Sequence, residues 1–255
     1  MLADLTSLDW TLIVVCAFVI GIAKTGIPGA GILSAPVLAA ILPPKPSTGF
    51  VLPMLIIADT LAVVYWRRDV KWKHLTKLLP IAAAGIVLGW LLMDRISNRW
   101  FGPLIGAIVA AMLAINYWRN AKWEGEPPVP EQWWFPVAVG LLAGLTTMMA
   151  NAAGPVMALY LLAMRLPKEE FIGTGAWFFI VVNCFKVPFQ LELGHITLDT
   201  FKVNLALAPV IFAGGVTGII IVRRLPQKYF VWIIEVLTAL AALNLIFPVR
   251  SLMGG

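Results

Sequence analysis

Long runs of apolar residues dominate the chain, and their lengths predict membrane-spanning helices. A helix that spans a membrane needs about 20 predominantly apolar residues. Six runs come close to this length: 49–66, 75–93, 100–118, 171–190, 200–222 and 228–247. The pattern predicts an all-α polytopic membrane protein.

Two further apolar runs, 10–42 and 134–164, are too long for one span and are interrupted near the middle. The interruptions read KTGIPGAG at 24–31 and TTMMANAAGP at 146–155. One helix over the first run would be roughly 50 Å long, against a hydrocarbon core of about 30 Å. Proline and glycine make a continuous helix costly there. We therefore predict a helix–break–helix hairpin in each run.

A polar stretch, RNAKWEGEPPVPEQ at 119–132, divides the chain near its midpoint and prompts a search for an internal repeat. Growing offsets of 119, 124 and 129 residues pair Pro36 with Pro155, Gly49 with Gly173, Asp59 with Asn183, Pro80 with Pro209, Gly85 with Gly214, Gly89 with Gly218 and Arg95 with Arg224. We predict two repeats, 1–119 and 134–255, joined by a linker at 120–133. Each repeat would hold one broken hairpin followed by three spans.

Loop charges predict how the two halves are oriented. Loop 67–77 is rich in Arg and Lys, loop 223–228 carries three basic residues and no acid, and loop 191–202 holds two acids and one lysine. The positive-inside rule then places the first two loops in the cytoplasm and the third outside. These sides agree only if 134–164 is a hairpin that begins and ends on one side. The halves would then be inverted repeats, with both termini outside.

Composition supports the membrane assignment and narrows the function. Of the 255 residues, 60% are hydrophobic and only 13% are charged, whereas a soluble domain carries about 25% charged residues. A cytosolic enzyme, a disordered protein and a nucleic-acid binder are excluded. The first ten residues lack the basic stretch of a signal peptide, so we expect the first apolar segment to stay in the protein. We expect a multi-pass protein of the cell (inner or plasma) membrane.

The two breaks are candidate binding positions for an anion. A helix that begins inside the membrane presents unpaired N–H groups and a positive dipole end. Two such ends, near Gly31 and Pro155, would converge on one anion site, and proline suits the first position of a helix. The alternative is that Gly and Pro only kink a packed helix.

Polar residues at or near the breaks are candidate substrate ligands: Lys24, Thr25, Gly29, Gly31, Thr147 and Asn151. A lysine at membrane depth indicates function, and its expected partner here is the anionic substrate. Lys24 could instead extend to the membrane interface. Asn151 could also be a plain helix cap.

Polar residues inside the later spans complete the candidate site. Asp59 lies in IIADTLAVV and is the candidate proton carrier, because burial in a membrane disfavours a charged carboxylate. Its other reading is an ion pair with Lys24. Asn183 and Lys186 lie one turn apart and are further substrate-binding candidates. For Glu235 we expect a structural or interface role.

Sequence motifs of soluble chemistry are absent. The sequence has no P-loop, GxSxG, HExxH or CxxC motif, so we expect no enzyme, cofactor or metal site. Cys16 and Cys184 would be buried apolar residues. His74 and His195 would lie in solvated loops.

Three stretches together resemble the sulfite exporter TauE/SafE family of bacterial and plant membrane permeases: GIAKTGIPGAGILSAPVLA, IIADTLAVVYWRRDVKW and VVNCFKVPFQLELGHIT. The resemblance covers essentially the whole chain. It implies transport, usually export, of small sulfur-containing anions such as sulfite, sulfoacetate or other organosulfonates. The second break is less Gly-rich than the first, which weakens any equal role in binding.

The leading hypothesis is therefore a secondary transporter that works by alternating access, with a small anion and protons as partners and a monomer or homodimer as the assembly. An anion channel, or a permease for another small anion, is the alternative. A third reading, an intramembrane enzyme or a subunit of a sulfur-metabolising complex, lacks a nucleophile–base pair in the sequence.

Overall fold

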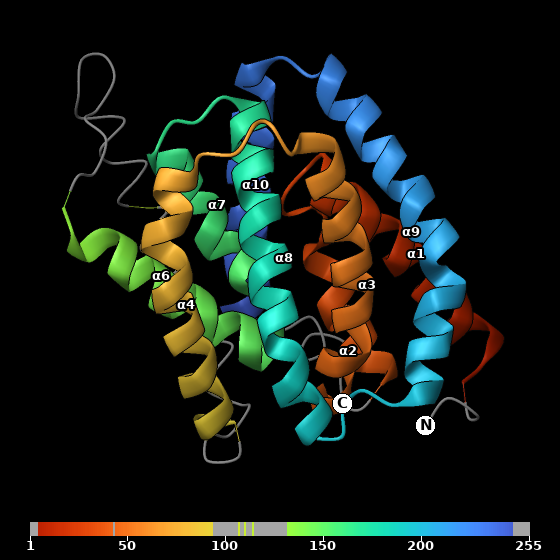
Figure 1. Ribbon diagram of the computed structural model, residues 1–255. Helices are drawn as coiled ribbons and strands as arrows, with labels where there is room; N and C mark the ends of the chain where they lie inside the picture. Colours follow the sequence, from red (N-terminus) through yellow and green to blue (C-terminus); the bar gives the residue numbers. More distant parts are fainter. Residues whose placement is uncertain are drawn as a thin grey trace.

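The computed structural model describes residues 5–42, 44–93 and 132–246, together with Ala107, Ala110 and Ala114. These residues form helices and turns, with no strand among them (Figure 1). The elements are α1 (Ser7–Thr25), η1 (Ala30–Leu33), α2 (Ser34–Ile41), α3 (Pro44–Trp66), α4 (Trp72–Leu92), α6 (Trp134–Ala150), α7 (Ala153–Ala163), α8 (Lys168–Glu192), α9 (Leu198–Arg224) and α10 (Gln227–Ile246). Most of the predicted span 100–118 and of the linker 120–133, with Arg95, lies outside the described residues.

The all-α membrane fold predicted from the apolar runs is confirmed. Five helices, α1, α3, α4, α8 and α9, are long and apolar enough to cross a membrane. The bounds of α3, α4, α8, α9 and α10 lie within a few residues of the predicted spans, and α1 is the first part of the run 10–42 that was predicted as a broken hairpin. The outer face of α9 exposes a row of large apolar side chains: Phe201, Leu205, Phe212, Val216 and Ile220. Such a face suits contact with lipid.

Both long apolar runs are broken inside the predicted stretches. α1 ends at Thr25 before η1 and α2, and α6 ends at Ala150 before α7. Gly29 has φ +98° and Asn151 has φ +52°, left-handed conformations that a right-handed helix cannot contain. We predicted Pro155 at the first position of the second helix, but it is the third residue of α7. Its missing N–H costs nothing there, because the first four N–H groups of a helix have no intrahelical partner.

Two pairs of helices pack closely, α1 with α9 and α4 with α6, and their glycine contacts advance in the same direction along both helices, so each pair runs parallel. A Cβ on Gly21 would collide with the backbone of α9 at Ile211 and Gly215, and one on Gly144 would collide with the backbone of α4 at Ala82. Small residues allow this approach, as is typical of helix pairs in membranes.

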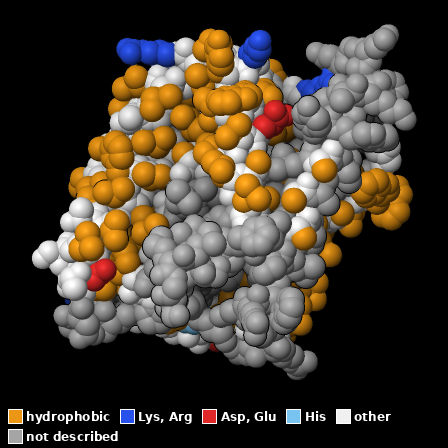
Figure 2. Space-filling view, turned by 180° about the vertical axis from the view of Figure 1, so that it is seen from behind, with side chains coloured by type: hydrophobic (Ala, Val, Ile, Leu, Met, Phe, Trp, Pro, Cys, Tyr) orange, Lys and Arg blue, Asp and Glu red, His pale blue; other side chains and the backbone are white. Residues whose placement is uncertain are grey.

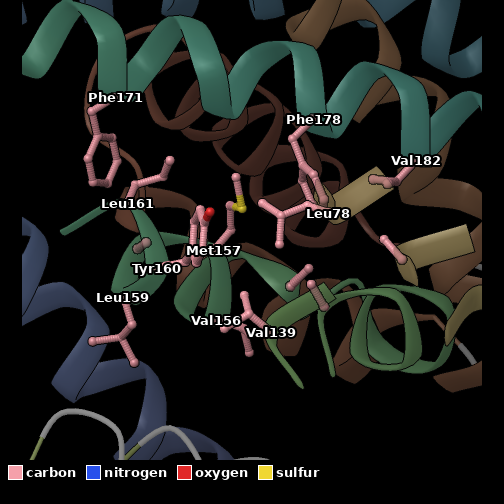
Figure 3. Packing of buried hydrophobic residues seen from close by; sticks show 14 of the residues in the cluster. Leu78, Val139, Val156, Met157, Leu159, Tyr160, Leu161, Phe171, Phe178 and Val182 are labelled. Carbon is pink, nitrogen blue, oxygen red and sulfur yellow. The ribbon is translucent and has the colours of Figure 1, made fainter. Parts of the chain in front are cut away.

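The buried apolar residues form two clusters. The larger is built mainly by α4, α6, α7, α8 and α10, and Figure 3 shows Leu78, Met157, Tyr160 and Phe178 converging within it. The smaller is built by α1, α2, α3 and α9 around Phe50. Each broken hairpin therefore has its own cluster, and α3 packs against α8 to join them.

One end of the molecule is basic, and α8 ties its loops together. The Lys71 backbone N–H donates to Thr174 Oγ1 at 3.0 Å, and Lys71 Nζ lies 2.9 Å from Glu170 Oε1. Lys168 Nζ donates to Val222 O at 3.0 Å and Leu225 O at 2.7 Å. The α3–α4 and α9–α10 loops therefore share one end, at the top of Figure 1. Figure 2 shows Lys and Arg side chains at this end and hydrophobic side chains over the flank below.

The expectation that both histidines lie in solvated loops was wrong for His74. His74 lies in the first turn of α4, where its Nδ1 is 2.8 Å from the Tyr160 hydroxyl. His195 follows α8 in a loop, but it is half-buried and its Nδ1 lies 2.8 Å from Gln190 Oε1. Cys16 is buried as expected, whereas Cys184 is exposed on the outer side of α8.

Candidate functional site

A buried ion pair lies where the first broken hairpin meets α3. Lys24 is in the last turn of α1, and its Nζ lies 2.9 Å from Asp59 Oδ1. The Asp59 side chain is fully buried and that of Lys24 is 15% exposed. The Lys24 side chain therefore points toward α3 and α8, where it contacts Asp59 and the Phe179 ring. Two roles were considered for Asp59, a proton carrier and an ion-pair partner of Lys24. The structure shows the ion pair.

Asn183 of α8 extends the cluster across the α3–α8 contact. Its Nδ2 donates to Asp59 Oδ2 at 2.6 Å. Asn183 is 1% exposed, and its Oδ1 is buried without a hydrogen-bond partner in the described part of the chain. Asp59 and Asn183 are the two residues that the offset of 124 pairs, and they meet directly in space.

Lys186, one turn after Asn183, holds the end of the second broken hairpin. Its Nζ donates to Thr147 O and Thr147 Oγ1, each at 3.0 Å, and to Asn151 Oδ1 at 2.6 Å. All three acceptors are neutral, and they lie at the C-terminal end of α6, where the helix dipole favours a cation. Lys186 is fully buried, and within the described residues no carboxylate lies within ion-pair distance of it.

The cluster therefore carries an excess of positive charge. Lys24 and Asp59 offset each other, and Lys186 adds a positive charge that no side chain described here neutralises. A buried charge without a counter-ion is costly, so this arrangement favours the approach of an anion. Thr147 and Asn151, predicted as substrate ligands, use their oxygens to bind Lys186.

The other residues predicted at the first break have structural contacts. Thr25 Oγ1 donates to Gly215 O at 2.7 Å, and the Thr25 carbonyl accepts from Trp66 Nε1 at 2.9 Å. Gly29 packs against Leu237 of α10, and Gly31 lies against α1. None of these contacts joins Thr25, Gly29 or Gly31 to the cluster, so their role in binding remains a prediction.

Sequence reasoning missed two members of the cluster. Lys24 Nζ lies 3.8 Å from the centre of the Phe179 ring, a cation–π contact. Phe179 precedes Asn183 by four residues on α8, so helical periodicity could have placed both on one face. Asn151 Nδ2 also donates to the Thr48 carbonyl at 3.0 Å, a backbone contact that no sequence signal reveals.

The start of α7 is open to a ligand. No side chain caps this helix at Ala152, and a Cβ on Gly154 would meet nothing within 4 Å. Uncapped N–H groups at a helix start attract anions. As for metals, no group of three or more His, Cys, Asp or Glu side chains gathers anywhere in the described ranges.

Broken helices around buried charged residues, within a bundle of membrane-length helices, define the class as a membrane transport protein. Residues 13–245 match the sulfite exporter TauE/SafE family, and the chain belongs to this family of membrane transporters. The resemblance seen in the sequence is thereby confirmed.

A curated relative of this chain is also named as a membrane transporter. The chain is 27% identical over 161 residues to "Probable inner membrane transporter protein TsaS" of Comamonas testosteroni. The match covers 62% of this chain and 65% of the relative, slightly less than two thirds of the relative's length. No solved structure matches the chain.

Proposed function

We propose that this protein is a secondary transporter, working as an exporter and not as an enzyme, for small sulfur-containing anions such as sulfite or an organosulfonate. The observation that carries the proposal is the buried cation Lys186, held by neutral acceptors beside the Lys24–Asp59 pair. One excess positive charge suits one anion. Membership of the family supports sulfur-containing anions as the class.

Alternating access needs two halves that can rock about a shared site, and reciprocal contacts support inverted repeats as those halves. At the start of α3, Gly49 packs against His195 beyond the end of α8. At the start of α8, Gly173, its partner in the offset of 124, packs against Asp69 beyond the end of α3. The parallel pairs α1–α9 and α6–α4 are likewise exchanged by the same repeat.

The proposal includes a sidedness. The basic end formed by the α3–α4 and α9–α10 loops would face the cytoplasm by the positive-inside rule. α1 begins at the opposite end, and α10 starts from the basic end and runs away from it, which would place both termini outside. An inner-membrane location follows the name of the curated relative.

Binding of a panel of anions tests the proposed site. Sulfite, sulfate, thiosulfate, sulfoacetate, taurine and acetate are added to purified wild type, and the melting temperature is measured. A ligand that binds only the folded state raises this temperature. We expect selective stabilisation by sulfite or an organosulfonate, and its loss in Lys24→Ala.

Lys202→Ala is the matched control, because it also removes one positive charge but from an exposed side chain near the start of α9. The control should respond to anions as wild type does. Equal stabilisation of Lys24→Ala and wild type would remove Lys24 from the site. A wild type that responds to none of the sulfur anions would indicate another substrate.

A further inference from the structure

The side-chain amide of Asn183 lies between a buried carboxylate and an unused acceptor position. Its Nδ2 donates to Asp59 Oδ2 at 2.6 Å, while its Oδ1 is buried without a partner among the described residues. A buried polar atom without a partner is costly and calls for an explanation. An amide carries a donor and an acceptor, and a half-turn of the group exchanges their positions.

The observed orientation suits an ionised Asp59. Oδ2 then accepts the hydrogen bond from Asn183, and Oδ1 forms the ion pair with the Lys24 ammonium. The geometry at Oδ1 is that of an ion pair and not of a hydrogen bond, so Oδ1 is, like Asn183 Oδ1, without a hydrogen-bond partner among the described residues. A proton on Oδ2 would face the N–H of Asn183, donor against donor. Turning the amide removes this conflict, because Oδ1 of Asn183 then accepts from the protonated carboxyl.

The same half-turn changes what the amide offers to a ligand. Nδ2 moves into the position where Oδ1 had no partner, so an N–H donor replaces an unpaired acceptor. Protonation also removes the negative charge that holds Lys24. A proton on Asp59 therefore supplies two new groups for an anion, the ammonium of Lys24 and the amide of Asn183.

We propose that Asn183 couples protonation of Asp59 to anion binding, so that one proton and one monoanion are carried together. This rests on the proposed transport function. The proton passes from water onto Asp59 Oδ2, no other bond changes, and Lys24 keeps its protons. The charge of Lys24, Asp59 and Lys186 together is +1 before binding. It is again +1 with the proton and the monoanion bound, so the loaded and empty sites carry equal charge.

Among the charged and titratable groups on the helices that pack around Asp59, Asp59 itself is the group that can accept the proton. α1 contributes Lys24, and α8 contributes Asn183 and, one turn further on, Lys186. α2 has no charged residue. The charged residues of α9 lie near its two ends, Asp199 and Lys202 at the start and Arg223 and Arg224 in the last turn. Lys186 Nζ donates to three acceptors, which only a protonated ammonium can do, and Lys24 Nζ forms an ion pair with Asp59. Cys184 is exposed on α8.

Proton uptake during anion binding tests the coupling. Purified protein in weak buffer is mixed with sulfoacetate, and the protons taken up per anion bound are counted at several pH values. We expect about one proton per anion in wild type and tighter binding as the pH falls. Asp59→Asn keeps a donor and an acceptor in place of the protonated carboxyl. It should bind the anion with no proton uptake and no pH dependence.

Asn183→Leu tests the amide itself. A hydrogen bond to a charged group accounts for roughly a tenfold change in affinity, so the ratio of low-pH to high-pH affinity should fall roughly tenfold. Cys184→Ser, on the next residue but facing outward, should behave as wild type. Anion binding without proton uptake in wild type, or an unchanged affinity ratio in Asn183→Leu, would overturn the coupling while leaving the transport proposal intact. If wild type does not bind sulfoacetate at all, the result would instead count against the transport proposal.

Discussion

At the scale of single residues, the candidate site is defined by the ion pair and hydrogen bonds of four side chains: Lys24, Asp59, Asn183 and Lys186. The sequence predicted these four because polar residues stand out within apolar runs. It could not choose between an ion pair and an interfacial position for Lys24, nor find the acceptors of Lys186. Those contacts join residues 35 and 124 apart in the chain, and they depend on how the helices pack.

Two lysines that cap helix ends allow a matched test at this scale. Lys186 donates to the end of α6 inside the bundle, and Lys168 donates to the end of α9 at the basic end. In Lys186→Met we expect anion affinity to fall at least tenfold, since the anion loses its attraction to an uncompensated positive charge, about 2 kcal/mol for unit charges roughly 8 Å apart at an effective dielectric constant of about 20. Its folded stability should change little, because removing a buried charge offsets the unpaired acceptors.

Lys168→Met should show the opposite pattern. Its folded stability should fall by about 1–3 kcal/mol, because two carbonyls lose their donor, while anion affinity stays at the wild-type value. Thermal unfolding and ligand titration of both variants separate the two roles. If both variants lose stability and keep affinity, Lys186 is only a helix cap.

At the scale of elements, the sequence predicted the break in each of the two long apolar runs, and most helix bounds within a few residues. Length and the Gly and Pro positions were sufficient, because a run much longer than a membrane must turn. The backbone conformation at the breaks could not be predicted from the sequence. Asn151 adopts a left-handed conformation that few non-glycine residues take, and Pro155 lies two residues later in α7 than predicted.

The close helix contacts give a prediction for this scale. In Gly144→Ala, the added Cβ would collide with the α4 backbone at Ala82, and overpacking of this kind costs about 1–3 kcal/mol. We expect a clear fall in melting temperature in detergent. Gly175→Ala is the control, because its Cβ would meet only Leu161 Cδ1 at an ordinary 3.6 Å. It should be as stable as wild type or more so, since alanine favours a helix. Equal losses in both variants would contradict the close α4–α6 packing.

At the scale of the whole molecule, the sequence predicted that the loops 67–77 and 223–228 share an end, because loop charges are read directly. It could not predict which helices pair. Small residues occur on several helices, so many pairings satisfy the same rule. The parallel pairs α1–α9 and α4–α6 emerge only from the three-dimensional structure.

Sidedness can be measured with single cysteines. In a chain carrying Cys16→Ala and Cys184→Ser, we introduce either Lys73→Cys at the basic end or Asp199→Cys at the opposite end, both at exposed positions. A membrane-impermeant maleimide added to intact cells should label Asp199→Cys and leave Lys73→Cys unlabelled. After the cells are opened, both should react. The reverse pattern would contradict the proposed orientation and place the termini in the cytoplasm.

The most direct test of the transport function is flux in proteoliposomes. Radiolabelled sulfite or sulfoacetate is loaded inside, and its release is followed for wild type, Lys24→Ala and Lys202→Ala. We predict saturable, anion-selective release by wild type and Lys202→Ala, and release at the protein-free rate by folded Lys24→Ala. Release that does not saturate would identify a channel. Equal release by Lys24→Ala and wild type would contradict the central claim that the Lys24–Asp59–Lys186 cluster binds the transported anion.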